Sequence, residues 1–133
     1  MIKLIVGKKG AGKTKQMMDM INENLKTVKG NIVCIEKSTQ LAYNISTSVR
    51  LVDVDEYKID SYDTFYGFFA GILAGNYDIE QIYVDGILKI NDIEMDGLGA
   101  LLEKIDAISK ETLVVFTVSA DEQELPIEIK KYL

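Results

Sequence analysis

Short apolar runs alternate along the chain with longer segments in which apolar residues recur every three or four positions. The short runs are typical of buried strands, and the periodic segments are typical of amphipathic helices. Buried strands are predicted at residues 1–6, 32–35, 82–85 and 113–118, and a half-exposed edge strand at residues 49–54. Helices are predicted at residues 14–28, 61–75 and 94–109, with a weaker one from Ser38 or Thr39 to Ile45 and a short element within 127–133. This alternation predicts an α/β fold, a three-layer αβα sandwich with a mostly parallel sheet of about five strands.

The turn between the first strand and the first helix carries the most informative pattern in the chain. Residues Gly7 to Thr14 read Gly-Lys-Lys-Gly-Ala-Gly-Lys-Thr, which matches the G-x-x-x-x-G-K-S/T pattern of a phosphate-binding loop. The glycines let the backbone curl around a polyphosphate, while Lys13 supplies a point charge and Thr14 a hydroxyl for magnesium. A glycine-rich turn without a ligand is the alternative, but the preceding strand and the following helix are the context that the motif requires. The candidate nucleotide-binding residues are Gly7, Lys8, Lys9, Gly10, Ala11, Gly12, Lys13 and Thr14.

A second signal for a nucleotide is the aspartate that ends the predicted strand at residues 82–85. In phosphate-loop proteins, an acidic residue at this position holds the water shell of magnesium opposite the hydroxyl of the loop. Thr14 and Asp85 are therefore the candidate metal ligands, although a strand that runs into an Asp-Gly turn is also common without any metal. Ligands bind at the carboxyl edge of a parallel sheet, where Glu36 and Ser119 are the next candidates.

These segments resemble the Walker A and Walker B motifs of the P-loop nucleoside triphosphatases, with Walker A at Gly7 to Thr14 and Walker B at Ile82 to Asp85. The resemblance implies a Rossmann-like P-loop NTPase fold that binds ATP or GTP with Mg²⁺, and a single nucleotide-binding domain over residues 1–133. It also implies that the backbone from Lys9 to Thr14 surrounds the phosphates, that Lys13 contacts the β and γ oxygens, and that Thr14 and Asp85 hold the metal.

Beyond the superfamily, the chain is similar to short bacterial proteins labelled twitching motility PilT-like ATPases. Pilus-retraction motors are much longer, carry an extra N-terminal domain and use motifs that contain histidine, so this resemblance extends at most to the nucleotide core. Additional-strand ATPases often place a catalytic glutamate directly after the Walker B aspartate, where this chain has Gly86. Recombinase-like members use a glutamate at the end of strand two, which is the position of Glu36. The resemblance therefore implies a catalytic role for Glu36, and the loop lysine, Lys13, is the second candidate catalytic residue.

Lys8 also resembles the signature lysine of dimerising partition-type ATPases, because it occupies the second position of the loop. Those proteins have glycine at the third position, where this chain has Lys9. The alternative is that Lys8 and Lys9 add positive charge near bound phosphate or are simply solvated.

Composition narrows the classes of partner and chemistry. A formal net charge of −6 argues against binding to duplex nucleic acid, which rests on a basic surface. The chain has no histidine, which excludes the usual Cys/His zinc sites and any histidine general base. The lone Cys34 permits no intrachain disulfide, and the longest apolar stretch, residues 65–75, is too short to span a bilayer. We therefore expect a cytoplasmic protein without membrane insertion.

Three functions fit these motifs. The first is Mg²⁺-dependent ATP binding with weak or partner-activated hydrolysis, in which the single arginine, Arg50, acts across a protomer interface or is an ordinary surface residue. The second is a small-molecule, nucleoside-type kinase, although no arginine-rich lid is evident, and the third is a non-hydrolysing, nucleotide-dependent binding module. ATP is preferred because no Asn-Lys-x-Asp segment for guanine is present. Gly67 and Gly71 share one helical face, which indicates either tight packing against the sheet or a protomer interface. For the chain as a whole, the candidate partners besides the nucleotide are another protein or a homo-oligomer.

Overall fold

The computed structural model describes residues 1–38, 41, 44–90 and 94–133. Its five strands form one sheet in the order β1-β5-β4-β2-β3, and all neighbouring strands are parallel. The strands are β1 (Ile2–Gly7), β2 (Asn31–Glu36), β3 (Val49–Asp53), β4 (Ile79–Asp85) and β5 (Leu113–Ser119). The predicted α/β fold with a parallel, five-stranded sheet is therefore confirmed.

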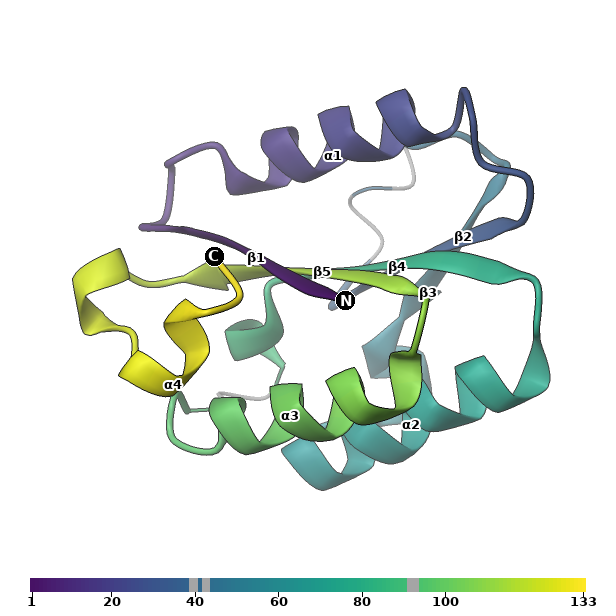
Figure 1. Cartoon of the computed structure of the whole chain (residues 1–133). Helices are drawn as coiled ribbons and strands as arrows, with labels where there is room; N and C mark the ends of the chain where they lie inside the picture. The colour runs from purple at the N-terminus through teal and green to yellow at the C-terminus, as the bar shows by residue number, and fades with distance from the viewer. Residues whose placement is uncertain (39–40, 42–43, 91–93) are drawn as a thin grey trace.

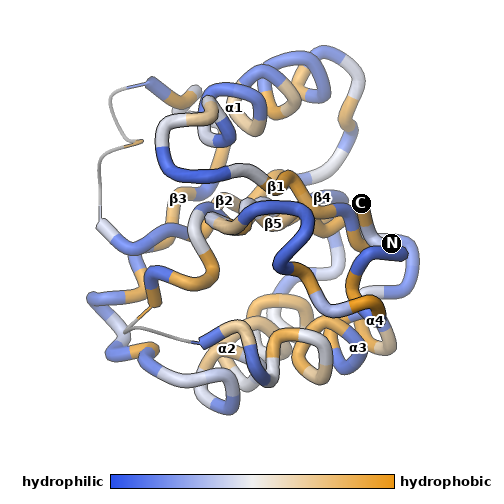
Figure 2. The backbone as a smooth tube through the Cα atoms, turned by 90° about the vertical axis from the view of Figure 1, so that its left-hand side faces the viewer, coloured by the Kyte–Doolittle hydropathy of each residue, from blue (hydrophilic) through white to orange (hydrophobic). Residues whose placement is uncertain are grey.

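Helices cover both faces of this sheet, as predicted for a three-layer sandwich. Helix α1 (Lys13–Asn24) covers one face, and α2 (Tyr62–Gly75) and α3 (Leu98–Ser109) cover the other (Figure 1). Because side chains alternate along a strand, each β-strand contributes to both cores, one beneath α1 and one beneath α2 and α3. Hydrophobic residues lie along the strands between the two helical layers (Figure 2). Shorter elements complete the chain: η2 (Val54–Tyr57), η3 (Ile87–Lys89), η4 (Glu122–Glu124) and α4 (Ile127–Lys130).

The two edges of the sheet differ. Strand β3 lies at one edge, as its half-exposed pattern predicts. Strand β1 lies at the other edge, where the backbone N–H of Leu4 donates a 2.8 Å hydrogen bond to the carbonyl of Tyr132 in the C-terminal segment. Strand β5 lies between β1 and β4, so an additional strand separates the strand that precedes the loop from the strand that ends in Asp85.

Two predicted helix boundaries need correction, and one predicted helix lies partly outside the described residues. Helix α1 ends at Asn24 rather than at Val28. The chain after Asn24 continues in turns, in which the Val28 N–H donates a 2.9 Å hydrogen bond to the Asn24 carbonyl. Helix α3 begins at Leu98 rather than near Glu94, since Gly97 has a φ of 94° that is incompatible with a helix. The weak helix predicted from Ser38 or Thr39 to Ile45 includes residues 39–40 and 42–43, which lie outside the described residues.

The glycines of α2 do not pack against the sheet, so that interpretation is wrong. A Cβ atom added at Gly67 or at Gly71 would meet no atom within 4 Å, and both residues are exposed. The opposite side of α2 makes the contact with the sheet, through the fully buried Phe65 and Phe69. The protomer-interface interpretation of the glycine face stays a prediction.

We expect Gly67→Ala and Gly71→Ala each to raise the free energy of unfolding by about 0.5–1 kcal/mol, because alanine restricts the unfolded chain and meets no steric obstacle here. Urea denaturation measures the change. Gly97→Ala is the opposing control, since its Cβ would lie 3.1 Å from the Tyr62 ring at a positive φ. A loss of stability in either α2 variant, together with a lower mass in sedimentation, would indicate instead that another protomer covers this face.

Candidate functional site

The loop between β1 and α1 requires glycine for two physical reasons. Gly10 and Gly12 have φ angles of 87° and 84°, a region that other residues rarely adopt. Gly7 has a different constraint, because a Cβ atom there would lie 2.9 Å from the Cβ of Ala11. The loop therefore doubles back closely on itself, and residues 8–12 are exposed to solvent.

The amino terminus of α1 offers unused hydrogen-bond donors at the end of this loop. Gly12 is the N-cap residue, no side chain caps the helix, and its first turn holds no acidic residue. The first N–H groups of a helix have no partner within the helix, and the helix dipole favours an anion near them. This donor set fits a phosphate group.

The side chain of Lys13 closes the loop in this structure. Its ammonium group donates a 3.0 Å hydrogen bond to the carbonyl oxygen of Lys8, which also accepts one from the Ala11 N–H at 3.0 Å. Burial and the neighbouring Lys89 ammonium lower the pKa of Lys13, while Asp85 opposes that shift. The Lys8 ammonium lies 3.6 Å from the Asp121 carboxylate, so Lys8 contributes its backbone to the loop and directs its side chain elsewhere.

Hydrogen bonds from two other elements hold Asp85, at the end of β4. The Thr14 hydroxyl, in the first turn of α1, lies 3.2 Å from both carboxylate oxygens. The Thr117 hydroxyl on β5 donates to one of those oxygens at 2.7 Å and accepts a hydrogen bond from the Gly86 N–H at 2.7 Å. Sequence reasoning missed Thr117, whose only signal was a polar residue within the apolar run of β5.

Strand register places Glu36 beside Asp85. Glu36 pairs with Asp85 on β4 and with Asp53 on β3. Its side chain is 4% exposed, and its carboxylate accepts a 3.0 Å hydrogen bond from the Leu41 N–H. Burial raises the pKa of Glu36, as do the two neighbouring carboxylates, against the opposing effects of the Leu41 N–H and the Lys89 ammonium.

The structure brings one of the remaining candidates to this edge and leaves another away from it. Ser119 pairs with Gly7 at the carboxyl edge of the sheet. Arg50 pairs with Val33, three positions before Glu36 on β2, and its guanidinium donates to the Leu51 carbonyl at 3.2 Å. Arg50 therefore does not reach the loop of its own chain. Among the residues that the structure describes, no group of three or more cysteine, aspartate or glutamate side chains is arranged to hold a metal ion.

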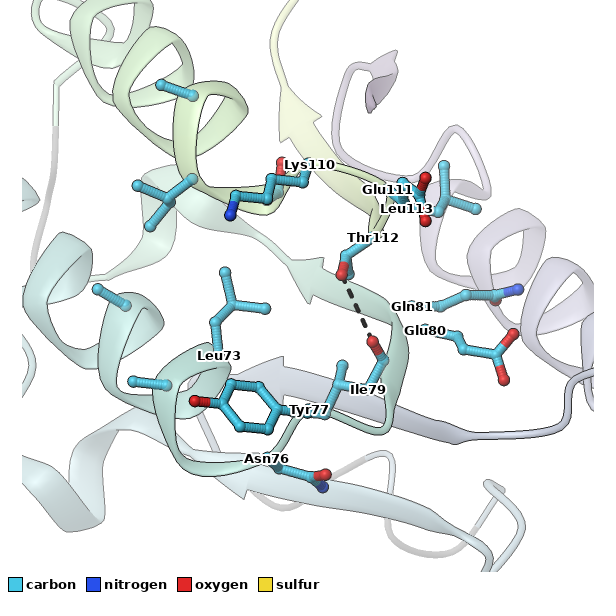
Figure 3. A pocket seen from close by; sticks show the side chains of 15 residues that line it. Leu73, Asn76, Tyr77, Ile79, Glu80, Gln81, Lys110, Glu111, Thr112 and Leu113 are labelled. Carbon is cyan, nitrogen blue, oxygen red and sulfur yellow. Dashed lines mark hydrogen bonds between the residues drawn. The ribbon is translucent and has the colours of Figure 1, made fainter.

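A separate groove of about 1020 Å³ lies at the amino ends of the strands, on the far side of the sheet from the loop. Asn76, Ile79, Thr112 and Leu113 line it near the amino ends of β4 and β5, and the Thr112 hydroxyl donates to the Ile79 carbonyl at 3.4 Å (Figure 3). The loop and the strand ends that carry Glu36 and Asp85 lie at the carboxyl edge. This groove is therefore not part of the candidate site.

Comparison with solved structures finds a similar fold in the crystal structure of flagellar accessory protein FlaH from Methanocaldococcus jannaschii, with a TM-score of 0.59 and 17% sequence identity. The alignment covers 98% of this chain but 65% of the FlaH chain. No protein-family model matches the chain, and no curated protein sequence does. The likeness supports the α/β fold, which is consistent with the P-loop NTPase fold that the sequence motifs imply.

Within the part of the chain that the structure describes, no helix is long and apolar enough to cross a bilayer.

We expect Glu36→Gln to stabilise the ligand-free protein near neutral pH. Burial raises the pKa of Glu36 on folding, so ionisation costs stability as the pH rises from its ordinary value through the raised one. The gain over the wild type should be small at about pH 4 and largest near pH 7, as measured by urea unfolding across that range. Glu103→Gln removes the same charge from an exposed position on α3 and controls for net charge. A gain that does not grow with pH would contradict the prediction.

Proposed function

We propose that this chain binds ATP together with Mg²⁺ at the Gly7 to Thr14 loop and hydrolyses it slowly or on contact with a partner. The contact between Thr14 and Asp85 carries the proposal. It joins the loop helix to the end of β4 across 71 positions of sequence, and both groups have the chemistry that a magnesium site beside a phosphate loop requires. Residues 1–133 would form one nucleotide-binding domain.

The phosphates would be held by backbone and charge together. The N–H groups from Lys9 to Thr14 and the uncapped start of α1 supply donors, and Lys13 supplies the charge for the β and γ oxygens. Lys13 would exchange the Lys8 carbonyl for a phosphate oxygen. Burial and repulsion from Lys89 lower the pKa of Lys13, and the negative charge of a bound polyphosphate would offset both effects by favouring the charged ammonium.

The residues present fit a magnesium ion that arrives with the nucleotide. Hydroxyl and carboxylate oxygens suit Mg²⁺, which keeps several waters and is usually bound by one or two protein groups plus substrate phosphates. Thr14 would contact the ion directly and Asp85 would hold its waters, with Thr117 fixing the orientation of the Asp85 carboxylate. When bound, Mg²⁺ neutralises charge that develops on the phosphates.

Glu36 would act as the general base for hydrolysis. Its carboxylate would take a proton from a water molecule as the water oxygen bonds to the γ-phosphorus and the bond to the β–γ bridging oxygen breaks, which releases ADP and phosphate. A raised pKa suits this role, because a base works best with a pKa near the operating pH. Arg50 does not reach the site of its own chain, so an arginine that assists hydrolysis would have to come from another protomer or protein. This supports slow hydrolysis when the chain acts without a partner.

We expect Lys13→Ala to weaken MgATP binding by roughly a hundredfold or more, because the γ- and β-phosphates lose their charged hydrogen bonds. Isothermal titration calorimetry gives the affinity, and circular dichroism checks the fold. Lys15→Ala is the matched control, since Lys15 is exposed on α1 and pairs with Asp19 at 2.8 Å. Retained affinity in a folded Lys13→Ala protein would refute the proposed site.

We expect Asp85→Asn to reduce the dependence of ATP binding on magnesium. The variant should bind ATP in excess chelator as the wild type does, but gain about tenfold less affinity when Mg²⁺ is added. Asp53→Asn provides a control at the same edge of the sheet, because the Asp53 carboxylate accepts hydrogen bonds from the Ser38 and Asp55 N–H groups. An unchanged magnesium effect in Asp85→Asn would separate Asp85 from the metal.

Turnover assays distinguish the three functional classes. Release of free phosphate from MgATP supports the hydrolase, and a phosphorylated acceptor supports the small-molecule kinase. Tight MgATP binding with neither product, with and without cell extract as a source of partners, supports the nucleotide-dependent binding module.

A further inference from the structure

A second lysine, Lys89, lies close to the candidate site and was not singled out by its sequence position. It ends η3, the short turn that follows Asp85 and Gly86. The Lys89 N–H donates a 2.9 Å hydrogen bond to the Gly86 carbonyl, so the chain reverses directly after β4. This reversal brings Lys89 back toward the carboxyl edge of the sheet.

The side chain of Lys89 folds over Gly86. A Cβ atom added at Gly86 would lie 2.9 Å from Cδ of Lys89, 3.4 Å from Cγ and 3.5 Å from Cε. Gly86 also has a φ of 71°, which disfavours other residues. The aliphatic stem of Lys89 thus occupies the space that a side chain directly after Asp85 would enter. The lysine stem therefore lies where a glutamate at position 86 would have placed its side chain.

The Lys89 ammonium interacts electrostatically with two other site residues. It repels the Lys13 ammonium and contributes, after burial, to the lowered pKa of Lys13. It attracts the Glu36 carboxylate and opposes the rise in the pKa of Glu36. Within the described ranges, no carboxylate lies within ion-pair distance of Lys89, whose side chain is exposed. The Lys13 and Lys89 ammonium groups therefore repel one another beside the Asp85 end of β4, and no ion pair among the described residues neutralises Lys89.

We propose that Lys89 is a second phosphate-binding residue of this site, which contacts the γ-phosphate of ATP from the side of Asp85. This inference rests on the proposed function. The stem of Lys89 lies over Gly86, directly after Asp85, and its side chain is exposed. The ammonium can therefore reach a terminal phosphate that the loop would hold between Lys13 and the end of β4. Lys89 supplies from within the chain part of the charge stabilisation that the distant Arg50 does not.

This position predicts discrimination between nucleotides. Lys13 and Lys89 repel one another, and a negative group between them would relieve that repulsion. A terminal γ-phosphate supplies that group, whereas a diphosphate leaves Lys89 without its partner. Lys89 should therefore favour ATP over ADP, while Lys13 should support both.

The test compares the affinities of MgATP and MgADP in the wild type and in Lys89→Met, Lys89→Arg and Lys13→Ala. We expect Lys89→Met to weaken MgATP binding about tenfold or more and to change MgADP binding less than about twofold. Lys13→Ala should weaken both, and Lys89→Arg should keep the preference for ATP because it keeps the charge. Lys29→Met, at an exposed position after α1, controls for the loss of one positive charge.

The outcomes separate this inference from the proposed function. If the wild type binds both nucleotides and Lys89→Met keeps the wild-type ratio of affinities, the role of Lys89 is overturned and the nucleotide site stands. An equal loss in Lys89→Arg and Lys89→Met would also overturn it, because charge would then not be the cause. If the wild type binds neither nucleotide, the proposed function fails and the inference fails with it.

Discussion

The parallel register between β2 and β4 is the constraint on which the candidate site depends. It pairs Glu36 with Asp85, so that an acid at the end of one strand lies beside an acid at the end of the next. A shift of one residue would turn Glu36 to the other face of the sheet, because side chains alternate along a strand. The same sheet places β5 between β1 and β4, which brings Thr117 within 2.7 Å of the Asp85 carboxylate.

Charge in this site is balanced poorly without a ligand. Glu36 is buried beside two carboxylates, and Lys13 is partly buried and repelled by a second lysine. Both effects disfavour the charged form of each residue, although their signs are opposite. A magnesium nucleotide would bring negative charge to the lysines and positive charge to the carboxylates, so one ligand would relieve both. The electrostatics and the backbone geometry of the loop thus favour the same class of ligand.

The sequence was most informative where local pattern determines structure. Apolar runs predicted the strands, and the motif spacing predicted that Thr14 and Asp85 would meet. The start of α3 was misplaced because it depends on Gly97 and on the hydroxyl of Tyr62, which donates to the Glu94 carbonyl from a distant helix. In α2, apolar residues lie all around the helix, so hydrophobicity alone did not show that the glycine face points to solvent. Thr117 and Lys89 could not be found either, because their roles follow from strand order and from a turn after β4.

The hydrogen bond from Lys13 to the Lys8 carbonyl has a consequence for how a ligand would arrive. The loop is already curled and its lysine already directed inward, so the conformational entropy of ordering these residues is lost during folding and not during binding. Binding then consists of replacing one oxygen acceptor and some water with another acceptor of greater charge. Because the loop is preorganised, ligand binding needs no slow rearrangement of the protein. The association rate should therefore depend on diffusional encounter, and the residence time on the number of contacts that the ligand makes.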